Sequence, residues 1–233
     1  MAEKIRYTRK DLKGPDEFIS TLGKGTAWAR ENRGKMVAAV VVVVLALAGV
    51  LGTRAYLLWQ DQKAAKDLWP HLNRARELVQ NPREVDPEKL IRLEQFLNGY
   101  VNMHPGAKTT VFARYYLGSI AYLRGEYEVS AAQFRSAIGL YQKQDTVMEF
   151  LAREGLAQAL EAKGDIHGAL AAYRDAASHA KGELRTQPWM GEARMLAGMG
   201  KKAEAAEVLR RILQENPDSP MREYIEVRLS QAG

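Results

Sequence analysis

The hydrophobic positions of this chain follow two patterns, an unbroken apolar run near the N-terminus and a periodic pattern beyond it. The run from Met36 to Thr53, MVAAVVVVVLALAGVLGT, carries no charge. Eighteen residues of helix extend roughly 27 Å at about 1.5 Å per residue, close to the ~30 Å thickness of a hydrocarbon core. Tyr56 and Trp59 follow, where interfacial aromatic residues usually sit. The run therefore predicts a single transmembrane helix.

An apolar run of this length could also be a buried core helix, a cleaved signal peptide or a lipoprotein anchor. A buried core helix is disfavoured because five consecutive valines are not amphipathic and valine is a mediocre helix former in water. A cleaved signal peptide could end at Ala46-Leu47-Ala48, but 35 residues would then precede its apolar core, which makes a long n-region. A lipoprotein anchor is excluded because the chain has no cysteine. The pattern favours an uncleaved signal anchor, with the cleaved signal peptide as the alternative.

Beyond Trp59 the apolar positions follow a helical period, and no alternating stretch predicts a strand. One helix is expected over 61–80 and its partner over 88–103, with Asn81-Pro82 and Asp86-Pro87 as breaks between them. The domain organisation that follows is a cytoplasmic basic tail (1–35), a transmembrane helix (36–58), a linker helix with a degenerate first repeat (59–107), three repeats (108–219) and a C-terminal capping helix (220–233).

The three repeats align on glycine-containing turns. Gly125-Glu126-Tyr127, Gly164-Asp165-Ile166 and Gly200-Lys201-Lys202 each separate two amphipathic helices, and their glycines lie 39 and 36 residues apart. Self-similarity at such a period is the signature of a solenoid, in which each helix pair buries its apolar face only by stacking on its neighbours.

These segments, of which the first reads YYLGSIAYLRGEYEVSAAQFRSAI, resemble tetratricopeptide (TPR) repeats. That resemblance implies an all-α fold, a right-handed α-solenoid of helix pairs. In it, small residues let paired helices approach closely and large residues fill the space between pairs. The matching repeat-packing residues are Leu117, Gly118, Phe134 and Ala137 in the first repeat, Ala157, Ala169, Tyr173 and Ala176 in the second, and Trp189, Ala193, Ala205, Leu209 and Pro217 in the third.

The net charge of +6 is unevenly distributed. Residues 1–59 hold ten basic and five acidic side chains, and the remainder holds 24 and 23. Nine of the basic residues precede the apolar run, so the positive-inside rule keeps the N-terminus in the cytoplasm and translocates the repeats. A nearly neutral repeat region disfavours nucleic acid as a partner. The tail, where a helix could begin at Gly14, is either solvated or an interfacial helix on the lipid bilayer.

The sequence offers no sign of catalytic chemistry, of a cofactor or of a metal site. The four histidines lie apart, without cysteine or acidic partners at ligand spacing, and are expected at the surface. The glycines follow repeat turns and form no phosphate-binding loop. Glu154 and Glu161 share a helix face and are expected to line a groove or face solvent. The chain is therefore not expected to be an enzyme.

The TPR resemblance places a protein-binding groove on the first helix of each pair. The positions that carry over are Phe112, Tyr115, Ser119 and Tyr122 in the first repeat, Glu154, Gln158 and Glu161 in the second, and Met190, Arg194 and Ala197 in the third. They predict a groove with an aromatic end and an acidic middle. Phe112 and Tyr115 suit the core equally well. The Lys/Asn set with which some TPR proteins clamp a C-terminal carboxylate is missing.

The layout of the whole chain also resembles YfgM-type proteins, the ancillary subunits of the bacterial Sec translocon. The resemblance rests on Ala29-Arg30-Glu31-Asn32 and Gly34-Lys35 before the apolar run, Arg54, Tyr56 and Trp59 after it, and FLNGYVNMHPG at 96–106. It implies a bacterial inner-membrane protein with a periplasmic domain that links the translocon with periplasmic chaperones or client chains. The tail is longer here and the repeats are clearer. A TPR scaffold of another envelope complex (cell division, pilus or secretion machinery) and an accessory protein with a small-ligand site are the alternatives.

Overall fold

The structure, a computed structural model, describes residues 26, 28–80, 86–140 and 147–232. Every regular element in these ranges is a helix, as the hydrophobic pattern predicts. The chain divides into two units, residues 1–59 and 60–233. The expected helix from Gly14 and the break at Asn81-Pro82 lie outside the described residues.

Helix α2, Arg33–Gln80, begins in the first unit and continues past Trp59 into the second. Residues 33–59 are exposed throughout, and α2 is long and apolar enough to cross a membrane. The polar side chain at the end of the apolar run is satisfied inside the helix, because the hydroxyl of Thr53 donates to the carbonyl of Gly49 at 2.8 Å. An apolar surface with its polar groups satisfied internally is what a bilayer requires.

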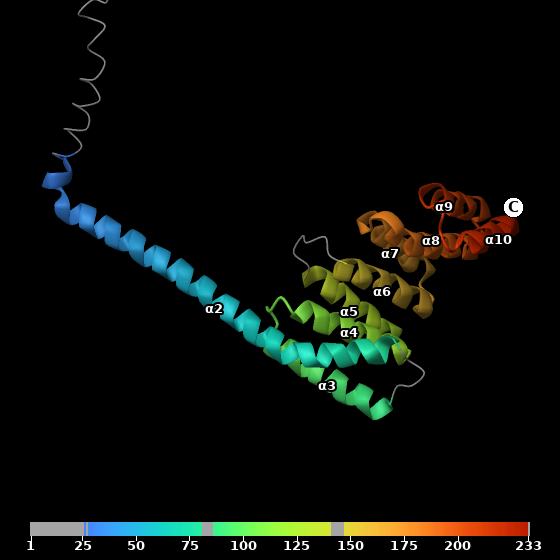
Figure 1. Cartoon of the computed structure of the whole chain (residues 1–233), viewed down its shortest axis with the longest axis horizontal. Coiled ribbons are helices and arrows are strands. Elements are labelled where there is room, and N and C mark those ends of the chain that lie inside the picture. The colour runs from blue at the N-terminus through green and yellow to red at the C-terminus, as the bar shows by residue number, and fades with distance from the viewer. Residues whose placement is uncertain (1–25, 27, 81–85, 141–146, 233) are drawn as a thin grey trace, which may run out of the picture. The chain divides into compact units, whose positions relative to one another are not determined.

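The second unit is a series of helices in which neighbours along the chain pack against each other (Figure 1). After the second half of α2 come α3 (Pro87–Met103), α4 (Thr110–Leu123), α5 (Tyr127–Leu140), α6 (Val147–Lys163), α7 (Ile166–His179), the 3₁₀ turn η2 (Gly182–Arg185), α8 (Thr186–Gly198), α9 (Lys202–Glu215) and α10 (Arg222–Ala232). The pairs α4/α5, α6/α7 and α8/α9 are the three predicted repeats. The right-handed sense of the series stays a prediction.

The three repeat turns share one geometry. Gly125, Gly164 and Gly200 have φ angles of 76°, 86° and 76°, in the left-handed region that favours glycine. In each turn the residue after the glycine donates its backbone N–H to a carbonyl five residues earlier, at 2.9 Å. This is the Schellman arrangement, which satisfies the last carbonyls of the first helix and reverses the chain into the second.

The core of the second unit consists of two apolar clusters. One joins α2, α3 and α4 through Leu68, Leu97 and Ile120, all fully buried. The other runs from α4 to α10 and contains the large side chains of the second helices, Phe134 and Tyr173. The degenerate first repeat thus packs on the regular ones as a further helix pair formed by the end of α2 and by α3.

Large side chains of the second helices lie against glycines. A β-carbon at Gly118 would come within 3.0 Å of the Phe134 ring, and one at Gly155 within 2.5 Å of it. A β-carbon at Gly191 would overlap the Tyr173 ring in the same way. Gly155 and Gly191 belong to the first helix of the next repeat, so each ring inserts between successive pairs where only glycine leaves room.

The other predicted repeat-packing residues are distributed as follows. Leu117, Ala137, Ala157, Ala169, Ala176, Trp189, Ala193, Ala205 and Leu209 are buried. Pro217 is exposed and follows Asn216, the C-cap of α9. Ser130 replaces an alanine of the repeat pattern, and its buried hydroxyl donates to the carbonyl of Gly118 at 2.8 Å. That bond offsets the cost of burying a hydroxyl where the pattern has a methyl group.

Candidate functional site

The predicted groove positions recur at one spacing on the first helix of each repeat. On α4, Tyr115 and Tyr122 are seven residues apart, as are Glu154 and Glu161 on α6. Positions separated by four and then three residues share one face of a helix. We call this surface of α4, α6 and α8 the groove face.

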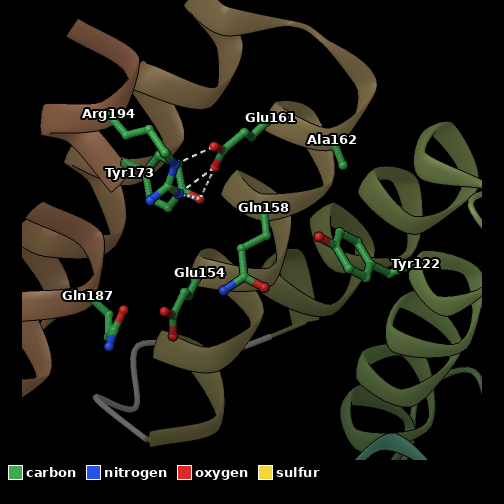
Figure 2. A pocket seen from close by; sticks show the side chains of 8 residues that line it. All are labelled: Tyr122, Glu154, Gln158, Glu161, Ala162, Tyr173, Gln187 and Arg194. Carbon is green, nitrogen blue, oxygen red and sulfur yellow. Dashed lines mark hydrogen bonds and ion pairs between the residues drawn. The ribbon is translucent and has the colours of Figure 1, made fainter. Parts of the chain in front are cut away.

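A cavity of about 390 Å³ opens on the groove face between α4, α6 and α8. Five of the predicted groove residues line it, together with three others. The lining residues are Tyr122, Glu154, Gln158, Glu161, Ala162, Tyr173, Gln187 and Arg194 (Figure 2). The cavity is therefore polar, with side chains from three consecutive repeats.

One wall of the cavity is a hydrogen-bonded set that ties α6, α7 and α8 together. Arg194 donates to both carboxylate oxygens of Glu161, at 2.5 and 2.7 Å, and the hydroxyl of Tyr173 donates to Glu161 at 2.6 Å (Figure 2). Burial would raise the pKa of Glu161, but these hydrogen bonds outweigh it and hold the pKa below its ordinary value. The charges of Glu161 and Arg194 therefore cancel.

Glu154 has no such partner. This half-buried carboxylate makes no ion pair or hydrogen bond with any residue that the structure describes, and no dashed line reaches it in Figure 2. Burial alone raises the pKa of Glu154 above its ordinary value. Burial likewise raises the pKa values of Tyr115 and Tyr122, and the carboxylate of Glu154 adds to the rise at Tyr115.

The remaining predicted groove residues lie elsewhere. Ser119 is buried, and its hydroxyl donates to the carbonyl of Tyr115. Phe112 and Tyr115 are half-buried and pack against the core, as the alternative interpretation of these residues proposes. Met190 is buried in the core and, with Ala197, lines a second cavity of about 240 Å³ beneath α10. Ser119 and Met190 do not reach the cavity on the groove face because they lie deep between neighbouring helices. Helical spacing alone does not specify how deeply a position is buried.

Two residues of this surface were not predicted. Gln187 precedes Arg194 by seven residues on α8 and reaches the cavity, so the spacing used for α4 and α6 could have found it. Trp69 is 51% exposed on α2, and its ring centroid lies 6.1 Å from that of Phe112. It extends the aromatic end of the groove face onto the degenerate repeat, where the repeat pattern is too weak to align.

The described residues contain no group of three His, Asp or Glu side chains that could hold a metal ion. His167 and His179 are exposed, whereas His71 and His104 are half-buried. The ring of His71 stacks on Phe96 with centroids 3.5 Å apart, and burial, with a contribution from Arg74, lowers the pKa of His71. The surface position expected for His71 and His104 is therefore corrected, because both rings pack against aromatic side chains of α3.

Comparison with solved structures supports the fold. A chain of Podosopora anserina assigned as a kinesin light chain, with nearly identical TPR-like repeats, has a TM-score of 0.58 and 15% identity, covering 71% of this chain and 85% of that chain. For a variant of the same protein the TM-score is 0.59, with 15% identity and 71% and 84% coverage. No protein-family model and no curated protein matches the chain. At 15% identity, this structural similarity establishes a TPR-like fold only. It carries no information about binding partners.

Proposed function

We propose that this chain is a non-enzymatic, membrane-anchored adaptor whose groove face binds a segment of a protein partner. The observation that carries the proposal is the cavity between three consecutive repeats, in which several polar groups have no partner among the residues that the structure describes. A TPR-like series of helix pairs presents such a surface continuously, because each pair contacts only its neighbours.

The aromatic end of the groove face supplies the apolar part of such a surface. Trp69 is half-exposed beside Phe112, and tryptophan is among the residues that most often dominate binding energy at interfaces. An exposed tryptophan at one end and an uncompensated carboxylate at Glu154 suit a polypeptide, which offers apolar and polar groups along its length.

Site-specific crosslinking tests this proposal. We expect p-benzoylphenylalanine at Tyr122 to give discrete adducts in living cells, because this ring lines the cavity. The same photoreactive residue at Arg210, exposed on the second helix α9, is the matched control and should give none. Mass spectrometry then identifies the crosslinked protein. Equal, diffuse adduct patterns from both positions would count against binding at the groove face.

We further propose that the first half of α2 anchors the chain in a bacterial inner membrane beside the Sec translocon, with the repeats in the periplasm to meet chaperones or emerging chains. The proposal is supported by the exposed apolar surface of residues 36–53 and by the basic tail that precedes it. The identity of the major partner that copurifies in mild detergent separates a translocon from another envelope complex.

The absence of cysteine makes the orientation directly measurable. A cysteine introduced at Gln214, exposed on α9, should react with a membrane-impermeant maleimide in intact spheroplasts. A cysteine at Thr8, ahead of the apolar run, should react only after lysis, because the positive-inside rule retains that segment in the cytoplasm. Labelling in the reverse order would overturn the proposed topology.

A further inference from the structure

The cavity on the groove face holds one charge that no described residue neutralises. Of its three charged side chains, Glu161 and Arg194 are joined by two hydrogen bonds. The Glu154 carboxylate remains, half-buried and without a partner among the described residues. Burying a charged group without a partner is unfavourable. A cation supplied from outside the chain would remove that cost.

The groups around Glu154 suit a cation that carries N–H donors. Gln158 and the hydroxyl of Tyr122 have no hydrogen-bond partner within the described residues, and the amide of Gln187 donates only to the sulfur of Met221, at 3.7 Å. Figure 2 shows Glu154, Gln158 and Gln187 around the same opening, with Tyr122 beyond Gln158. Amide and hydroxyl oxygens accept from ammonium or guanidinium N–H groups, and tyrosine rings attract cations at their faces.

From this arrangement we infer that Glu154 is the specificity-determining residue of the groove face, and that it binds a lysine or arginine side chain of the segment that occupies the cavity. The inference rests on the proposed function, since it names the chemistry of the partner at the same site. It also accounts for the lack of a Lys/Asn clamp, because a cavity with net negative charge attracts cations and repels a C-terminal carboxylate.

Selection from a random-peptide library on the full chain in nanodiscs tests this inference. We expect the selected peptides to be enriched in lysine or arginine at one position. Glu154→Gln should weaken their binding about tenfold, as expected for the loss of a charge-assisted hydrogen bond. Changing the basic residue of the peptide to norleucine should have the same effect, and combining both changes should add little. Glu207→Gln, an exposed glutamate on α9, is the matched control.

The outcomes separate the inference from the proposed function. Peptides whose binding is lost with Tyr122→Ala or Trp69→Ala, but which show no basic preference, would overturn the role of Glu154 and leave the groove intact. An absence of peptides that depend on Glu154 or on either aromatic residue would overturn the groove itself. Thermal unfolding of Glu154→Gln should occur at or above the wild-type temperature, because the substitution removes an unpaired charge, so weaker binding cannot result from unfolding.

Discussion

Replacing Phe134 by alanine is expected to lower the free energy of unfolding of the second unit, residues 60–233, by about 3–5 kcal/mol. The ring is 3% exposed and lies between Gly118 of its own repeat and Gly155 of the next. Neither glycine has a side chain that could move into the space that the ring leaves, so a cavity remains at the junction of two repeats. Urea denaturation of the full chain in mild detergent, followed by circular dichroism, measures the loss.

The contact between Gly155 and the Phe134 ring also predicts that the effect of Gly155→Ala on stability depends on whether the ring is present. Gly155→Ala alone should cost about 1–3 kcal/mol, because its β-carbon would overlap the Phe134 ring. In the Phe134→Ala background the same change should be neutral or stabilising, since alanine fills part of the cavity and favours a helix by about 0.5–1 kcal/mol over glycine. Gly139→Ala, which has open space around it on α5, is the control and should stabilise both backgrounds. An equal cost in both backgrounds would contradict the proposed contact.

The turns were predicted from the sequence, whereas these ring–glycine contacts between repeats were not. A glycine such as Gly125 ends a helix through its own backbone conformation, which is a local property. Gly155 and Gly191 matter because of rings on the preceding helix, 21 and 18 residues earlier. A sequence signal did exist, since each lies two residues before the small residue that the repeat pattern places in the first helix.

The candidate site was likewise predicted from the sequence only in part. Helical spacing placed Glu154, Gln158 and Glu161 on one face of α6, where all three line the cavity. It did not predict that Arg194 neutralises Glu161, because that pairing depends on the separation of α6 and α8. Nor did it indicate which acidic residue would be left unpaired. The sequence alone places two negative charges, Glu154 and Glu161, in the middle of the groove. Within the described part of the chain, only the Glu154 carboxylate is left without a compensating charge.

Two arginines in the middle of the apolar run, Val43→Arg with Leu47→Arg, are expected to release the chain from the membrane. The run from Met36 to Thr53 holds seven valines and three leucines, which together favour insertion by about 3–6 kcal/mol. Each arginine near the centre of a span costs about 2.5–3.5 kcal/mol and also removes one of these apolar residues. The free-energy cost of inserting two arginines therefore exceeds the favourable contribution of the whole run. Carbonate extraction of membranes measures the result, and the wild-type chain should stay in the pellet.

The exchange Val43→Leu with Leu47→Val is the matched control, because it keeps the composition of the run and should leave the chain in the membrane. Both positions are exposed in α2 and lie outside the second unit. Thermal unfolding of the repeats should therefore be the same in the wild type, the double-arginine variant and the exchange variant. Release of the wild-type chain at full length would exclude an anchor. A mature chain that begins after Ala48 would instead support the cleaved signal peptide, because cleavage there removes most of the apolar residues that hold the protein in the bilayer.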